Sequence, residues 1–231
     1  MKFNNWLLLY PVFLVFAIIA AIYLGVTKIE ENIPKDKSSS FVDCLKLLGD
    51  TSVLLFFLGI ISHVGIDVGV NTCAPKIIME RLGLPLEKAG IATSIYFLFR
   101  TLGCFSGSFI LAKSSLPKFF AVSVFCMVLS MLGLFVCHTL AGLYVSIALV
   151  GFGNSNIFSM IFSRALLYMP EKNNELSGLL IMGLIGGTIF PLLMGVLSDA
   201  LGSQIGSVIV ISFGVAYLVY LAYTLNKKVK V

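Results

Sequence analysis

Three polar side chains recur at four-residue intervals inside a long apolar stretch, and they are the first candidates for chemistry. His63, Asp67 and Asn71 would share one face of a helix, because residues four apart lie on the same face. An aspartate at membrane depth costs roughly 2.5–3.5 kcal/mol on insertion scales, so Asp67 must face protein or water. Two interpretations remain open. The face is either a polar wall of a substrate pathway, in which Asp67 binds hydroxyls or exchanges a proton, or a polar contact between two helices.

Arg100 is the other charge inside an apolar stretch, and it lies near the middle of residues 89–112. At that depth its side chain does not readily reach the membrane surface. Asp67 lies near the middle of the preceding stretch and is the opposite charge available there. We therefore predict that Arg100 is the buried charge partner of Asp67, directly or through a shared water. The alternative role for this pair is to fix the register of two helices.

Two asparagines close to a pair of glycines form the next candidate site. Asn154 and Asn156 would face nearly opposite ways in a regular helix, which turns about 100° per residue. Either one asparagine bonds a neighbouring helix, or Gly151 and Gly153 let the helix unwind there. Broken helices at mid-membrane line the binding sites of many transporters, so Asn154 and Asn156 join the candidate ligands of a polar substrate.

Glycine and proline also predict local structure in two of the apolar stretches. Gly183, Gly187, Pro191 and Gly195 recur every four residues, which favours a close helix contact with a kink at the proline. Pro75 is expected to end or bend the helix that carries the His63, Asp67 and Asn71 face.

The composition identifies the environment in which these helices must lie. Hydrophobic residues make up 58% of the 231 residues and charged residues 12%, against roughly 45–50% and 25% in soluble domains. The mean hydropathy is +1.02. These values exclude a soluble domain, a disordered chain and a disulfide scaffold. The five cysteines have no metal-type or redox spacing and are expected to pack as small apolar residues. The chain is predicted to be an all-α integral membrane protein.

Seven stretches are long enough to cross about 30 Å of hydrocarbon as helices. Only Asp67 and Arg100 are charged within them. We expect a lone transmembrane helix in residues 1–26, a linker in residues 27–50 and a six-helix bundle in residues 51–231, in which two three-helix repeats are a natural arrangement. The predicted spans are 6–26, 51–74, 89–112, 119–137, 140–162, 176–197 and 205–225.

The distribution of basic residues predicts the orientation. Eleven lysines and arginines fall on one set of loops and ends, and four fall on the opposite set. Cytoplasmic loops carry the excess of basic residues in membrane proteins. The linker 27–50 and the C-terminus are therefore predicted to be cytoplasmic and the N-terminus to lie outside.

Several motifs that would support an enzyme do not occur in the sequence. It contains no phosphate-binding loop of the GxxxxGK[ST] type, no HExxH, no G-x-S-x-G and no carboxylate cluster for a divalent metal. We therefore predict no catalytic residues, no metal, no cofactor and no nucleic-acid partner.

Four segments together resemble the sugar–proton symporters of the fucose-permease type within the major facilitator superfamily. The stretch from His63 to Asn71 followed by Pro75 is similar to the family's seventh helix. Residues 105–118 resemble its eighth helix and the loop after it, residues 156–166 its tenth helix, and residues 178–199 its eleventh helix.

The resemblance implies two six-helix halves joined by a long cytoplasmic loop, of which this chain looks like the last helix of the first half, the loop and the complete second half. It implies proton-coupled transport of a hexose-like or fucose-like sugar across the plasma (inner) membrane by alternating access. The partners would be the sugar, protons, the lipid bilayer and either an N-terminal half or a second copy. In such symporters the proton-coupling acids lie mainly in the first half. The sugar's hydroxyl partners would be His63, Asp67, Asn71, Asn154 and Asn156.

Two other readings of the chain stay open. It could be a non-transporting membrane scaffold or the inactive remnant of a split transporter gene. A seven-helix receptor has only the helix count in its favour.

Overall fold

The computed structural model describes residues 9–28 and 41–228, with only the backbone for residues 226–228. The chain divides into two compact units, Met1–Ser38 and Ser39–Val231, and each is described by itself. The described part of the first unit contains one helix, α1 (Leu9–Val26), whose side chains are all exposed. Its 18 apolar residues extend about 27 Å at 1.5 Å per residue, close to the thickness of the hydrocarbon core.

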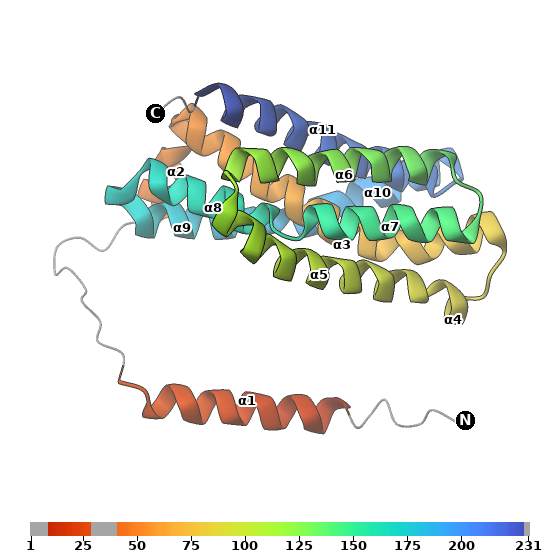
Figure 1. The fold of residues 1–231 in the computed structure, drawn as a ribbon, viewed down its shortest axis with the longest axis horizontal. Coiled ribbons are helices and arrows are strands. Elements are labelled where there is room, and N and C mark those ends of the chain that lie inside the picture. The colour runs from red at the N-terminus through yellow and green to blue at the C-terminus, as the bar shows by residue number, and fades with distance from the viewer. Residues whose placement is uncertain (1–8, 29–40, 229–231) are drawn as a thin grey trace. The chain divides into compact units, whose positions relative to one another are not determined.

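The described part of the second unit consists of helices joined by short connections (Figure 1). Half of the linker predicted at residues 27–50, residues 29–40, lies outside the described residues, and its last part forms the short helices α2 and η2. The elements of this unit are α2 (Phe41–Lys46), η2 (Leu47–Gly49), α3 (Thr51–Leu82), α4 (Leu86–Ala89), α5 (Ile91–Lys113), α6 (Leu116–Val136), α7 (Leu140–Asn154), α8 (Ile157–Tyr168), η3 (Pro170–Lys172), α9 (Asn173–Met182), η4 (Gly183–Ile185), α10 (Gly186–Leu201) and α11 (Ile205–Lys228).

Among the described residues, seven helical segments are long and apolar enough to cross a membrane. They coincide with the seven spans predicted from the sequence, and the all-α membrane architecture is confirmed. The fifth span is shared by α7 and α8, and the sixth by η3, α9, η4 and α10.

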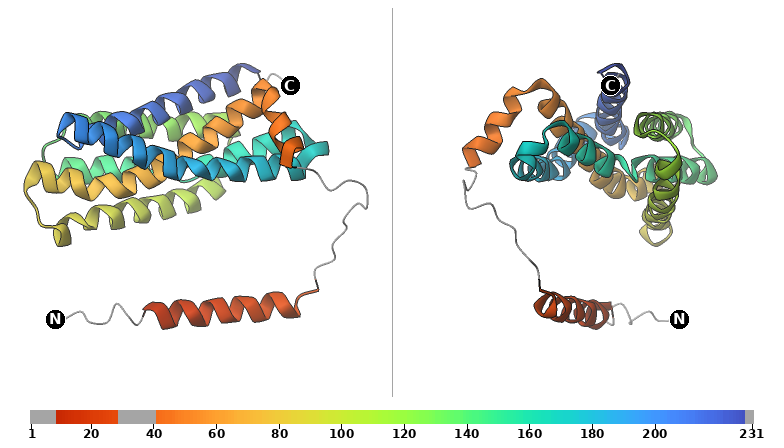
Figure 2. Two further views of the ribbon diagram at one scale, coloured as in Figure 1. Left: turned by 180° about the vertical axis from the view of Figure 1, so that it is seen from behind. Right: turned by 60° about the vertical axis from the view of Figure 1, so that its left-hand side comes forward.

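Helix α3 is the central element of the bundle. It packs against α10 and α11 on one side and approaches α5, α7 and α8 on the other, while α6 lies between α7 and α11 (Figures 1 and 2). This arrangement brings residues of α5 and α7 next to the middle of α3.

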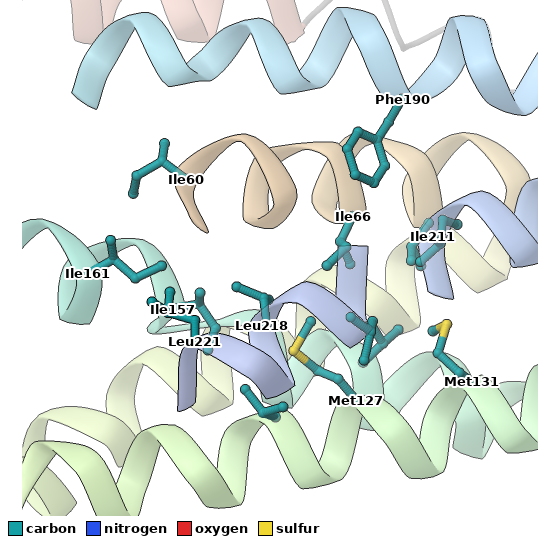
Figure 3. Packing of buried hydrophobic residues seen from close by; sticks show 14 of the residues in the cluster. Ile60, Ile66, Met127, Met131, Ile157, Ile161, Phe190, Ile211, Leu218 and Leu221 are labelled. Atoms are coloured by element: carbon teal, nitrogen blue, oxygen red, sulfur yellow. The ribbon is translucent and has the colours of Figure 1, made fainter. Parts of the chain in front are cut away.

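The core is formed by aliphatic, methionine and aromatic side chains from most helices of this unit, and Figure 3 shows its part between α3, α6, α8, α10 and α11. Phe190 of α10 lies over α3 at Gly65, where a Cβ atom would overlap its ring. Gly65 is therefore required for the close approach of α10 to α3, as expected where small residues let two membrane helices come together.

The sequence predicts that Pro75 ends or bends its helix, and the prediction that the helix ends there is wrong. Helix α3 begins at Thr51, where Asp50 Oδ1 accepts from Ser52 N at 2.7 Å, and it continues through Pro75 to Leu82. A proline lacks only one backbone donor, so neighbouring turns can keep the helix intact. Gly83, in the left-handed conformation with φ 62°, ends it.

The glycine-rich sixth span is interrupted at the 3-10 turn η4 (Gly183–Ile185), and Pro191 lies further along inside helix α10. The turn comes where the backbones are closest, since a Cβ atom at Gly186 would overlap the main chain of Ile61 in α3. The close helix contact predicted for this stripe is present, but the interruption belongs to the glycines and not to the proline.

Candidate functional site

Five polar side chains from three spans meet at the middle of the bundle. His63 and Asp67 come from α3, Tyr96 and Arg100 from α5, and Asn154 from the end of α7. We call these five residues the polar cluster.

Asp67 is the acceptor at one end of the polar cluster. Arg100 Nη1 lies 2.7 Å from Asp67 Oδ2, and the Tyr96 hydroxyl donates to Asp67 Oδ1. The Asp67 side chain is 19% exposed and that of Arg100 29%. Both charges are therefore only partly covered by this unit, and a ligand on its open face can reach them.

His63 and Asn154 form the buried end of the polar cluster, exposed by only 2% and 0%. His63 Nδ1 lies 2.8 Å from Asn154 Oδ1, and because an amide oxygen only accepts, Nδ1 carries the hydrogen. Asn154 Nδ2 donates to the Tyr96 hydroxyl at 3.3 Å and to the His63 carbonyl at 3.4 Å. Hydrogen bonds thus run from His63 through Asn154 and Tyr96 to Asp67, each donating toward the carboxylate.

Helix packing explains why these side chains can meet. A Cβ atom at Gly151 would lie 2.6 Å from the Tyr96 carbonyl oxygen, so only a glycine lets α7 come this close to α5. Asn154 lies one turn after Gly151 and is the last residue of α7. The glycine brings the helix in, and the asparagine then reaches both Tyr96 and His63.

The fifth span breaks immediately after Asn154, between α7 and α8. Of the two possibilities left open by the sequence, the bond from Asn154 to a neighbouring helix is present. The helix is also interrupted, but not at the two glycines. The interruption lies at Ser155 and Asn156, whereas Gly151 and Gly153 remain inside α7.

Asn156, a predicted site residue, does not join the polar cluster. Its Nδ2 donates to the Gly103 carbonyl at 2.8 Å and to Ser155 Oγ at 2.9 Å, and its amide lies against Gly107 of α5. Within the described residues its hydrogen bonds hold the broken helix to α5. In this arrangement Asn156 is a packing residue.

Asn71 is also separate from the cluster, one turn beyond Asp67 on α3. Its Oδ1 atom is buried and has no hydrogen-bond partner among the described residues. An unsatisfied buried acceptor costs about 1–3 kcal/mol, so Asn71 offers a position at which a donor group would be stabilising.

Tyr96 was not among the residues predicted from the sequence, although its hydroxyl joins Asn154 to Asp67. Its spacing contained a signal, since it precedes Arg100 by four residues and so shares its helix face. No group of three or more His, Cys, Asp or Glu side chains that could hold a metal occurs among the described residues. The polar cluster can both accept and donate hydrogen bonds, because it contains a carboxylate acceptor and has a guanidinium and a phenol as donors.

Known proteins resemble this chain in sequence over part of their length. A Helicobacter pylori protein provisionally named a glucose/galactose transporter is 25% identical over 210 residues, covering 89% of this chain and 50% of that protein. The Brucella abortus glucose/galactose transporter is 28% identical over 154 residues, covering 65% of this chain and 37% of its own length. The chain spans half or less of the length of these relatives. No family model matches it.

Solved structures resemble the fold closely. The major facilitator superfamily transporter FucP in the outward conformation aligns with a TM-score of 0.79 at 21% identity, covering 93% of this chain and 53% of FucP. A single-residue variant of the Escherichia coli fucose:proton symporter FucP aligns with the same TM-score at 19% identity and covers 54% of that structure. The resemblance stated from the sequence is confirmed. The described fold is that of about half of a major facilitator superfamily transporter, and the similar proteins are named as transporters and not as enzymes.

Proposed function

We propose that this chain supplies one half of a sugar transporter that works by alternating access. The observation that carries the proposal is the polar cluster, which places an accessible carboxylate and guanidinium at the middle of a bundle that is otherwise apolar. Charges at membrane depth are expensive and mark substrate or ion pathways. The names of the relatives support a hexose such as glucose or galactose as the substrate.

A hexose presents several hydroxyl groups, each of which donates and accepts. Asp67 would accept from one hydroxyl and Arg100 would donate to another, in place of part of their mutual contact. Asn71 Oδ1 lies one helical turn away and lacks a donor, but the atom is buried, so the Asn71 amide would have to rotate toward the sugar before it accepts from a third hydroxyl. His63 and Asn154 would then orient Tyr96 rather than contact the sugar, because both are buried.

The proposal also includes the coupling of sugar transport to protons. Asp67 is the carboxylate of the polar cluster and can bind a proton when the sugar separates it from Arg100. The similarity of the fold to a fucose:proton symporter supports this step.

The second half of the pathway would come from a complementary six-helix half. Transporters of this kind bind substrate between their two halves and expose it alternately to each side. The proposed location is the plasma (inner) membrane.

The test joins this chain to the half of the Helicobacter pylori relative that it does not match, and measures uptake of labelled glucose and galactose in proteoliposomes. We expect uptake, and we expect Asp67→Asn to reduce it by about a hundredfold, as for loss of a group that binds both sugar and proton. Glu171→Gln is the matched control, because Glu171 is an exposed carboxylate in η3, away from the cluster.

Two results would contradict the proposal. Uptake that survives Asp67→Asn unchanged would remove the polar cluster from the pathway. A folded, monodisperse fusion that moves no hexose would favour the non-transporting scaffold or inactive fragment.

A further inference from the structure

A second polar site lies between α3, α10 and the start of α11, apart from the polar cluster. A cavity of about 110 Å³ opens there, and its polar lining comes from Thr72, Lys76, Ser198, Asp199, Gln204 and Ser207. We call it the α3–α10 pocket. One buried water needs about 10–15 Å³ by the same measure, so the pocket has room for several waters or for part of a small molecule.

The deep wall of the α3–α10 pocket is fixed by hydrogen bonds. The hydroxyl oxygens of Ser198 and Ser207 lie 2.9 Å apart, and both residues are buried. Ser207 also donates to Gln204 Oε1 at 3.3 Å. The loop before α11 is held by Glu80 of α3, which accepts from Ser203 Oγ at 2.5 Å and from Gln204 N at 2.6 Å. The wall is therefore preorganised and is not a chance gap between helices.

The rim of the pocket carries one charge of each sign. Lys76 on α3 and Asp199 on α10 both line it, and neither has an ion pair or a side-chain hydrogen bond within the described part of the chain. The Lys76 ammonium would repel a lone cation, and the Asp199 carboxylate would repel a lone anion. The lining therefore favours a ligand without net charge that both donates and accepts hydrogen bonds.

The pocket lies further along α3 than the polar cluster and on the other side of the helix, the side that packs against α10 and α11. At 1.5 Å per residue, Thr72 lies about 7.5 Å and Lys76 about 13.5 Å along the helix from Asp67. This direction leads toward Leu82, the end of α3 predicted to lie outside.

We propose that the α3–α10 pocket is a second, separate binding site for a neutral polyhydroxylated ligand, namely the sugar itself. Asp199 accepts from sugar hydroxyls, and Lys76 and Gln204 donate to them. The identity of the ligand rests on the proposed function. The pocket itself is built entirely from one six-helix unit, so it binds sugar without a complementary half.

The test uses the Met194 methyl group, which lines the pocket and is buried. The fusion of this chain to a complementary half, labelled with ¹³C-methyl methionine, is titrated in detergent micelles with D-galactose and D-glucose, and the Met194 signal is identified by its loss in Met194→Leu. We expect a saturable shift in that signal. Asp199→Asn should raise the apparent dissociation constant by about tenfold, the effect of losing about 1.4 kcal/mol.

A filling variant provides a second, independent readout. A Cβ atom at Gly195, in the lining, meets no atom within 4 Å, so Gly195→Leu should extend into open space and block the pocket without disturbing the fold. Gly178 in α9 is equally open and lies outside the lining, which makes Gly178→Leu the matched control. We expect the sugar-dependent shift to disappear in the first variant and to remain in the second.

The outcomes separate this proposal from the proposed function. Asp67→Asn should abolish uptake by the fusion and leave the Met194 shift intact. Hexose uptake that depends on Asp67, together with no Met194 shift up to high sugar concentration, would overturn the second site alone. A shift produced by sodium chloride or glycine but not by the sugars would show that the pocket takes an ion or a zwitterion instead.

Discussion

Asp67 does more than form an ion pair, because its two carboxylate oxygens bond different partners. Oδ2 faces Arg100 at 2.7 Å, and Oδ1 accepts from Tyr96, which is itself held by Asn154. The attraction within a pair that only fixes helix register would be strongest on complete burial, where water cannot compete, although burial also costs the hydration of both charges. Instead the buried members of the network are the uncharged ones, and the two charges lie at its accessible edge.

Arg100→Met tests how much the ion pair stabilises the bundle. Removing the guanidinium leaves Asp67 without its 2.7 Å partner, and an unsatisfied group of this kind costs about 1–3 kcal/mol. We expect a lower thermal unfolding temperature in detergent, and we expect Asp67→Leu combined with Arg100→Met to recover most of it. Lys113→Met, at the exposed end of α5, is the control. An unchanged melting temperature in Arg100→Met would show that the pair adds nothing to stability.

The sequence revealed the charged members of the polar cluster more readily than the uncharged ones. Asp67 and Arg100 were conspicuous because no other charge lies inside a predicted span. Tyr96 could not be distinguished in the same way, because tyrosines occur in membrane helices for many reasons and only the packing at Gly151 brings its hydroxyl to Asn154. Asn156 looked equivalent to Asn154 in sequence, but its position after the end of α7 turns it toward α5.

Composition determines where the helical spans lie, and contacts between helices determine where those spans are interrupted. Hydropathy predicted all seven spans, because each must hide its backbone from lipid. The interruption at Ser155 and Asn156, the 3-10 turn η4 and the uninterrupted passage of α3 through Pro75 were not predictable in position. Each depends on what a neighbouring helix offers, such as the Gly103 carbonyl that accepts from Asn156.

Gly107→Ala tests the docking of the broken fifth span against α5. A Cβ atom there would lie 2.6 Å from Asn156 Cγ, so the side chain that bonds Gly103 must move. We expect a loss of about 1–3 kcal/mol in the free energy of unfolding, typical of overpacking. The matched variant Gly178→Ala meets no atom within 4 Å and should instead stabilise its helix by about 0.5–1 kcal/mol. Equal effects of the two variants, measured by denaturation in mixed micelles, would contradict this account of the contact between α5 and Asn156.

At the scale of the whole molecule, orientation is the property that the basic residues predict and the fold does not report. A single cysteine placed at Lys28 in a cysteine-free background should react with a membrane-impermeant maleimide only after cells are permeabilised, because the linker is predicted to be cytoplasmic. A cysteine at Leu84, in the connection between α3 and α4, should react in intact cells. The reverse pattern would invert the topology and move the α3–α10 pocket to the cytoplasmic side.

The six-helix unit has an open face, which is marked by the exposed parts of the Asp67 and Arg100 side chains. Asp67 and Arg100 bond one another but are still 19% and 29% exposed on it, and charged side chains exposed to lipid are costly. Something must cover that face in a bilayer: either a complementary half or a second copy of the unit. These 231 residues expressed alone should therefore be dimeric or aggregation-prone in detergent, as measured by light scattering, and should take up no hexose in liposomes.

Fusion to a complementary half should change both results together, because covering the face and completing the pathway are the same event. We expect the fused protein to be monodisperse and to accumulate hexose when a proton gradient is applied. A stable monomer of the 231 residues that performs proton-driven uptake by itself would show that the six-helix unit needs no complementary half. The polar cluster would then have to lie within a pathway enclosed by this unit alone, and alternating access would require movement between its two three-helix parts rather than between two halves.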